Sequence, residues 1–193
     1  MSRSADRTRS RILSAAYELF YKEGFARVSM DAIALAGGVT KKTLYYHFAS
    51  KDALAAAVLD AQHRHALAHI RTWGKQAAKT PGAYLLGVFA ALESWAATPR
   101  WHGSGFTRLT MELADLPGHP VRQAAHHHKA AVEAWLADEL TRLSAAAPEH
   151  LARQVMLLIE GCLSLVLIHG DRSYVAAAAR AAERLAEDGR GQT

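Results

Sequence analysis

The chain has 193 residues, half of them apolar, so it can form one medium-sized domain or two smaller ones, each with a hydrophobic core. There are 23 basic and 18 acidic residues, a formal net charge of +5, and residues 1–55 hold nine of the basic residues against five acidic ones. The single cysteine excludes an intrachain disulfide framework. A basic excess at one end is typical of a phosphate-binding surface, although a solvated basic face is the simpler alternative.

The first predicted element is an amphipathic helix over residues 7–22. Ile12, Ala16 and Leu19 recur at the spacing of one helix face. Gly24 follows, and glycine commonly ends a helix because it adopts the left-handed conformation without steric cost. We therefore expect a helix that buries one side and stops at residues 23–25.

Residues 29–54 predict two short helices, a tight turn and the start of a third helix. Ser29 and Thr40 are favourable N-caps, and the glycines at 37 and 38 supply the turn between them. The second short helix, at residues 41–46, can turn Leu44 and Phe48 inward together because they lie four residues apart. Its other residues are basic, hydroxyl-bearing or aromatic. This is a helix-turn-helix arrangement with a helix suited to the DNA major groove.

The rest of the chain also predicts helices. They are expected at residues 51–75, 81–98, 105–115, 120–146, 148–169 and 174–187, and strand patterns are absent, so the predicted fold class is all-α. The most apolar run, residues 155–168, is broken by Glu160, Gly161 and Ser164 and is shorter than the ~20 residues that span a bilayer. The polar first eleven residues lack the apolar segment of a secretory signal, so we expect a cytoplasmic location.

Residues 7–55 resemble the N-terminal DNA-binding domain of the TetR family of transcriptional regulators. The resemblance rests on the E-G-F that ends the first helix, on I-A through G-V-T, and on T-L-Y-Y-H-F followed by S-K-D-A-L. It implies a three-helix DNA-binding domain at residues 1–55 and a larger helical ligand-binding and dimerisation domain at residues 56–193. It also implies that the helix from residue 51 carries ligand-driven movement to the DNA-binding helices.

The DNA-contacting residues are expected in and around the second short helix. Thr43 and Lys42 should reach bases or flanking phosphates, and Lys51 should contact the backbone, which would explain a lysine at the positive end of a helix dipole. The full predicted set is Arg27, Ser29, Thr40, Lys41, Lys42, Thr43, Tyr45, Tyr46, His47 and Lys51.

Each of the helices at 120–146 and 148–169 is apolar beyond a single stripe, so it must be covered on more than one side. The resemblance implies that these two helices form a dimer seam. In the family, two helices of each subunit pair into a four-helix bundle. The alternative is that both stripes are intrachain core. The predicted seam consists of Val121, Ala125, His128, Val132, Leu136, Val155, Ile159, Cys162 and Val166.

A small-molecule pocket is predicted among large apolar groups and a few polar ones on several helices, although an ordinary core has the same composition. Its predicted residues are Trp101, His102, Phe106, Met111, Glu112, His127, Trp135, Met156 and Glu160, with Trp95, Arg108 and His169 as further candidates. We expect no metal site, because three consecutive histidines on a helix point in different directions. His65 and His69, four residues apart, could chelate an ion but lack a nearby carboxylate or cysteine partner. We also expect no cofactor. Enzyme motifs such as G-x-S-x-G and H-E-x-x-H are absent.

The resemblance implies a homodimeric regulator, a repressor that binds a palindromic operator and is released by a small molecule. An activator on the same scaffold is the alternative. The rival is a helical enzyme or small-molecule carrier with an incidental basic N-terminus, for which DNA affinity would be salt-sensitive but blind to sequence.

Overall fold

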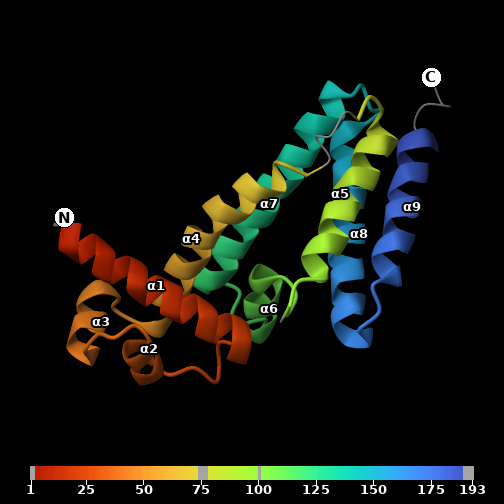
Figure 1. Cartoon of the computed structure of the whole chain (residues 1–193). Coiled ribbons are helices and arrows are strands. Elements are labelled where there is room, and N and C mark those ends of the chain that lie inside the picture. The colour runs from red at the N-terminus through yellow and green to blue at the C-terminus, as the bar shows by residue number, and fades with distance from the viewer. Residues whose placement is uncertain (1–2, 74–77, 100, 189–193) are drawn as a thin grey trace. The chain divides into compact units, whose positions relative to one another are not determined.

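The computed structural model describes residues 3–73, 78–99 and 101–188. Nine helices and no strand occur in that part of the chain, which confirms the predicted all-α fold class (Figure 1). The helices are α1 (Arg3–Glu23), α2 (Met30–Ala36), α3 (Lys41–His47), α4 (Lys51–Ile70), α5 (Pro81–Ala96), α6 (Gly105–Glu112), α7 (Pro120–Arg142), α8 (Pro148–His169) and α9 (Ser173–Asp188).

Hydroxyl side chains begin several of these helices, as the sequence predicts. Ser29 accepts a hydrogen bond from the Ala32 backbone N–H at 3.1 Å, and Thr40 accepts one from Thr43 at 3.1 Å. Ser50 caps α4 in the same way. Each bond satisfies one N–H that has no partner inside the helix, which stabilises the helix by about 1 kcal/mol.

Four helices end earlier than predicted. Helix α5 ends at Ala96 rather than residue 98, and α6 ends at Glu112 rather than residue 115. The last turn of α4 closes at Ile70 and the chain turns over residues 71–73, whereas the predicted end at residue 75 lies outside the described residues. Helix α7 ends at Arg142 rather than residue 146, because Ser144 and Ala147 take left-handed backbone conformations with φ of 57° and 44°. Two such residues cannot continue a right-handed helix.

The chain divides into two compact units. Unit 1 comprises residues 1–66 and 104–128, and unit 2 comprises residues 67–103 and those from 129 onward. The core of unit 1 joins α1, α2, α3 and the start of α4 to α6 and the start of α7. Its buried residues include Ile12, Phe20, Ile33, Leu44, Leu54, Phe106, Leu109 and Val121. The helix-turn-helix therefore shares its core with residues 104–128, whereas the predicted division fell at residue 55.

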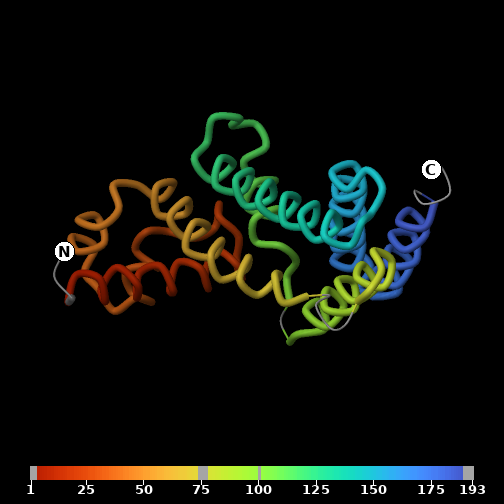
Figure 2. Tube along the Cα trace, turned by 90° about the horizontal axis from the view of Figure 1, so that it is seen from above, coloured from red at the N-terminus to blue at the C-terminus, as the bar shows by residue number. Residues whose placement is uncertain are grey.

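Unit 2 is built around α5, α8 and α9, which lie side by side (Figures 1 and 2). Tyr84, Leu85 and Val88 of α5 are fully buried against them. Helix α8 is long and apolar enough to cross a membrane, but the core helix of a soluble protein meets the same two criteria. The buried side of α8 packs into the core of unit 2, and this packing explains why that side of the helix is apolar.

Candidate nucleic-acid interface

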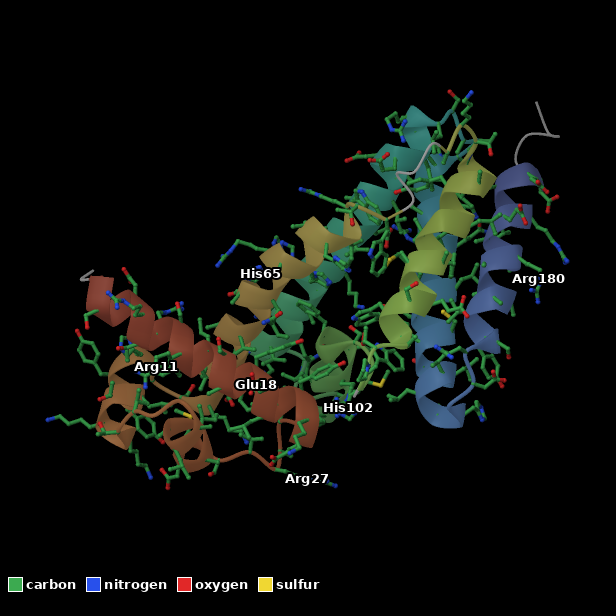
Figure 3. All side chains as sticks on the ribbon, in the orientation of Figure 1. Arg11, Glu18, Arg27, His65, His102 and Arg180 are labelled. Carbon is green, nitrogen blue, oxygen red and sulfur yellow. The ribbon has the colours of Figure 1, made fainter. Side chains whose placement is uncertain are left out.

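The turn between α2 and α3 is held from behind by α1. Gly38 has a left-handed φ of +59°, which the predicted glycine turn requires. Arg11 on α1 donates hydrogen bonds from its Nη2 to the carbonyl oxygens of Gly37, at 2.7 Å, and Gly38, at 2.8 Å (Figure 3). A cation on these carbonyls complements the negative end of the α2 dipole and fixes the angle at which α3 leaves the turn.

Sequence reasoning had not singled out Arg11. A side-chain cation near a helix C-terminus is a general signal, but nothing in the local pattern connects α1 to a turn 26 residues away.

Helix α3 buries one face and exposes the other. Leu44 is fully buried and Phe48 nearly so, which anchors the helix to the core of unit 1. Tyr46 is 82% exposed and Tyr45 is exposed as well. An exposed tyrosine on a rigid short helix offers a hydroxyl and a ring to a partner surface at little entropic cost.

The N-terminal end of α3 carries two linked hydroxyls. The Oγ1 atoms of Thr40 and Thr43 lie 2.8 Å apart, within hydrogen-bond distance. Lys41 is paired with Asp31 of α2, with Nζ 2.8 Å from Oδ1, and this contact raises the pKa of Lys41. Lys42 is exposed, and no ion pair to it is found among the described residues. Lys42 is therefore the cation of this helix most available to a phosphate.

The ten predicted DNA-contacting residues all lie in unit 1 and none is buried. Arg27 lies exposed in the loop between α1 and α2 (Figure 3). Ser29 and Thr40 already serve as N-caps, so any contact from them to DNA adds to a structural role. His47 packs edge-on against Tyr46, with ring centroids 5.3 Å apart.

Lys51 folds back onto the loop before α2. Its Nζ lies 4.3 Å from the centroid of the Phe25 ring and 3.5 Å from the carbonyl oxygen of Ala26, to which it donates. Burial lowers the pKa of Lys51, and the negative charges of Asp52 and Glu112 oppose that shift. These contacts offset the unfavourable interaction of a lysine with the positive end of the helix dipole. They leave the half-buried Lys51 ammonium at the surface of unit 1.

The nine predicted ligand-binding residues divide between the two units. Phe106, Met111, Glu112 and His127 belong to unit 1, and the other five belong to unit 2. Met111 is exposed, whereas Trp135 is buried in the core of unit 2. Glu160 forms an ion pair with Lys129 of α7, and Glu112 binds backbone N–H groups of the loop after α1. Both carboxylates therefore have partners inside their own unit.

An open pocket of about 670 Å³ lies in unit 2, between α5 and the end of α4. Ligand pockets commonly have volumes of ~300–1,000 Å³. Among the residues that line this pocket, only Trp95 was predicted from the sequence to contact a ligand. The small residues on one side of α5 were the sequence signal that could have indicated the pocket. The lining residues are His69, Thr72, Trp73, Ala83, Gly87, Ala90, Ala91, Ser94, Trp95 and Thr98.

All nine residues of the predicted dimer seam are buried within a single chain. Val121 and Ala125 belong to the core of unit 1, and Val132, Leu136, Val155, Ile159, Cys162 and Val166 belong to the core of unit 2. His128 stacks on Phe106, with ring centroids 3.7 Å apart. Intrachain packing therefore accounts for this stripe, which was the alternative interpretation.

The opposite face of α8 is apolar and exposed. Leu157 and Ile168 are each 71% exposed, and Leu165 is exposed at the edge of the same face. Gly161 lies between them, and a Cβ added there would meet no atom within 4 Å. A helix face of this kind has no cover within one chain.

The histidines form no metal-binding group of three or more in the part of the chain that the structure describes. His63 of α4 and His128 of α7 instead pair through their Nδ1 atoms, 3.1 Å apart, with the His127 ring beside them. Cys162 is buried, and burial raises its pKa to about 11. A thiol in this state is an inert packing group at neutral pH.

Comparison with known proteins connects this geometry to one family. The family model described as "Bacterial regulatory proteins, tetR family" matches residues 12–58. The sav143 protein of Streptomyces avermitilis, assigned to the TetR regulators, has a solved structure that is 30% identical, with a TM-score of 0.78. The match covers 91% of this chain and 98% of that one. The chain belongs to the TetR family of transcriptional regulators.

Two curated relatives support the same assignment. The HTH-type transcriptional regulator YjdC of Escherichia coli is 28% identical over 93% of this chain and 92% of its own length. The HTH-type transcriptional regulator UidR of E. coli is 44% identical over 37% of this chain and 36% of its own. TetR-family regulators bind DNA, function as dimers with small-molecule effectors and are not enzymes, which excludes the rival enzyme hypothesis.

Proposed function

We propose that this regulator binds a palindromic operator as a homodimer, with α3 of each subunit in the major groove. The exposed face of α3 carries the proposal: Thr43, Lys42 and Tyr46 stand on a helix that Leu44, Phe48 and the Arg11 contact hold rigidly. Bases are read by hydroxyl and methyl groups, and phosphates are bound by amines and tyrosine hydroxyls. In this proposal the protein is a cytoplasmic repressor, and a small molecule releases it from DNA.

The experiment is selection from a random pool of labelled duplexes by the purified protein. A regulator of this kind enriches an inverted repeat with half-sites about one helical turn apart, or a multiple of that distance. Titration of the enriched duplex and of a random duplex at several salt concentrations measures the specificity ratio. Enrichment of no sequence, with equal affinity for both duplexes, would contradict the proposal.

The dimer interface in this proposal is the exposed face of α8, formed by Leu157, Gly161, Leu165 and Ile168. Apolar side chains that one chain leaves in water are covered when two copies pack α8 against α8. Gly161 lets the two backbones approach closely, since it has no side chain and nothing near it within the chain. The stripe first predicted on α7 and α8 is already used inside each chain.

The effector site in this proposal is the pocket of unit 2. Trp73 and Trp95 provide flat apolar walls, and Ala83, Gly87 and Ala90 leave room beside them. Four of the ten lining side chains are polar, those of His69, Thr72, Ser94 and Thr98, and none of the lining side chains carries a fixed charge. An uncharged molecule with both apolar and hydrogen-bonding groups suits such a lining.

A further inference from the structure

The loop after α1 forms a small anion-binding nest. Gly24 has a left-handed φ of +89°, and the next two backbone N–H groups, those of Phe25 and Ala26, point to the same oxygen-rich partner. Successive N–H groups after a left-handed residue make a concavity that binds anions. The nest belongs to the loop that carries Arg27 and leads into the Ser29 cap of α2.

The carboxylate of Glu112, from the last turn of α6, fills this nest. Its Oε1 accepts from the Phe25 N–H at 3.1 Å and its Oε2 accepts from the Ala26 N–H at 2.9 Å. The φ of Gly24 favours glycine, and a Cβ there would lie 2.9 Å from Glu112 Oε1 and would displace the carboxylate. Hydrogen bonds to an ionised acceptor are stronger than neutral ones.

A second side chain on the same face of α6 binds the end of α1. Arg108, one helical turn before Glu112, donates from Nη1 to the carbonyl oxygen of Tyr21 at 2.6 Å. Arg108 thus binds a carbonyl group in the last turn of α1, and Glu112 binds the N–H groups of the loop that follows α1. Because each charged side chain binds backbone groups of the opposite polarity, the two contacts together fix the orientation of α6 against the end of α1.

The two residues that Glu112 binds are the same two that Lys51 contacts. Ala26 donates its N–H to Glu112 and accepts at its carbonyl from Lys51, and Phe25 donates its N–H to Glu112 while its ring lies under the Lys51 ammonium. The Phe25 ring also packs against Phe20 and His119, so loss of the Glu112 contact would remove one restraint, on the backbone N–H groups of the two residues against which Lys51 rests.

We propose that Glu112 is a positioning residue for DNA binding, which acts by holding the loop at Phe25 and Ala26 and, through it, the Lys51 ammonium. This proposal rests on the proposed DNA-binding function and on the phosphate contact predicted for Lys51. It replaces a ligand-binding role for Glu112 with a role inside unit 1.

Whether Glu112→Gln strengthens or weakens DNA binding distinguishes this proposal from a purely electrostatic effect of the carboxylate. A carboxylate close to DNA repels phosphates, so its removal by Glu112→Gln should strengthen DNA binding if charge alone matters. If Glu112 positions the loop, the same change weakens binding, because glutamine offers one acceptor and one NH₂ group to two N–H donors. Glu18→Gln is the matched control, since Glu18 is an exposed α1 residue with no such contact (Figure 3).

The experiment measures the affinity of the full-length dimer for the duplex enriched from the random pool, as a function of salt. We expect Glu112→Gln to bind about tenfold more weakly, because the Lys51 phosphate contact of each subunit is weakened, while Glu18→Gln stays within about twofold of the wild type. In a Lys51→Gln background the further loss from Glu112→Gln should vanish, because the two residues act in series. Arg108→Gln, which loosens α6 without touching the nest, should keep its own effect in that background.

Three results would overturn the proposal. One is binding of Glu112→Gln that equals or exceeds the wild type. Another is a loss of the same size with and without Lys51, which would indicate general loosening of unit 1; thermal melts of each variant check for unfolding. A third is unchanged affinity and salt slope for Lys51→Gln alone, which would refute the phosphate contact itself. If Lys51→Gln weakens binding and Glu112→Gln does not, only the role of Glu112 fails.

Discussion

Thr43 has a structural role at the start of α3 and a proposed role in DNA recognition. Its backbone N–H donates to the Thr40 cap, and its hydroxyl lies 2.8 Å from that of Thr40, so the rotamer is fixed before DNA arrives. A fixed rotamer loses little entropy on binding. Its methyl group is then free to meet a thymine methyl and its hydroxyl to meet a base edge.

We expect Thr43→Ala to weaken binding to the enriched duplex by about 1–3 kcal/mol and binding to random DNA by much less. Thr43→Ser keeps the hydroxyl and removes only the methyl group, so it separates the two contacts. Fluorescence anisotropy with both duplexes measures the effect. Equal losses on the two duplexes would show that Thr43 does not read bases.

Cys162 gives a residue-scale test of burial in unit 2. Only the thiolate reacts with iodoacetamide, and with a pKa near 11 roughly one thiol in a thousand is ionised at pH 8. We expect the native protein to resist alkylation at pH 8 and the urea-unfolded protein to react quickly, as mass spectrometry will show. The pKa of Cys162 is higher in the folded than in the unfolded protein. The contribution of this thiol to the free energy of unfolding is therefore highest below about pH 9 and is lost as the pH rises through about 11. Rapid labelling of the native chain would contradict the buried position.

At the scale of the element, the orientation of α3 depends on a contact from α1. Arg11 binds two carbonyl groups of one turn, and a Cβ at Gly38 would lie 2.7 Å from its Nη2, so the turn and the arginine fit each other closely. Base reading requires a helix held to a fraction of an ångström, whereas phosphate attraction does not.

We therefore expect Arg11→Gln to lower the affinity for the enriched duplex by about tenfold while the affinity for random DNA falls much less. The log–log salt slope should change little, because Arg11 is bound to backbone carbonyls rather than to DNA. Arg64→Gln, an exposed arginine of α4 in the same unit, is the matched control. A slope that shrinks by about 2 per dimer would show instead that Arg11 contacts a phosphate.

At the scale of the whole molecule, assembly depends on the uncovered face of α8. Leu157→Asp and Gly161→Arg both place charge on that face, where neither alters the core of unit 2. We expect both variants to stay folded by circular dichroism and to sediment as monomers or weakened dimers, since a buried unpaired charge costs several kcal/mol. Leu116→Asp changes an exposed leucine in the loop before α7 and serves as the control. Dimers that survive both α8 substitutions would place the interface elsewhere.

The effector response is a property of the whole dimer. A ligand that releases the regulator from DNA must bind the DNA complex more weakly by the same factor by which it weakens DNA binding. We expect a ligand found by screening to quench tryptophan fluorescence through Trp73 and Trp95, and its affinity to fall when saturating operator DNA is present. Ala90→Trp should obstruct part of the pocket and weaken the response while DNA binding persists. Equal ligand affinity with and without DNA would exclude release by ligand.

The sequence by itself determined the helices, their hydroxyl caps and the helix-turn-helix, because these depend on residues a few positions apart. Ser29, Thr40 and Gly38 each act on a backbone group within four residues, and the exposed face of α3 follows from Leu44 and Phe48 alone. Family membership could be predicted for the same reason, since the matching motifs are local.

Only the tertiary structure decided which partner covers each apolar or charged side chain. Periodicity shows that α8 has more than one apolar face, but not that α5 and α9 cover the face with Val155 and leave Leu157 in water. Glu112 looks like any polar group beside a pocket until the fold brings it to backbone groups 86 and 87 residues away. Such contacts depend on how helices pack across long stretches of chain, and local spacing carries no information about that packing.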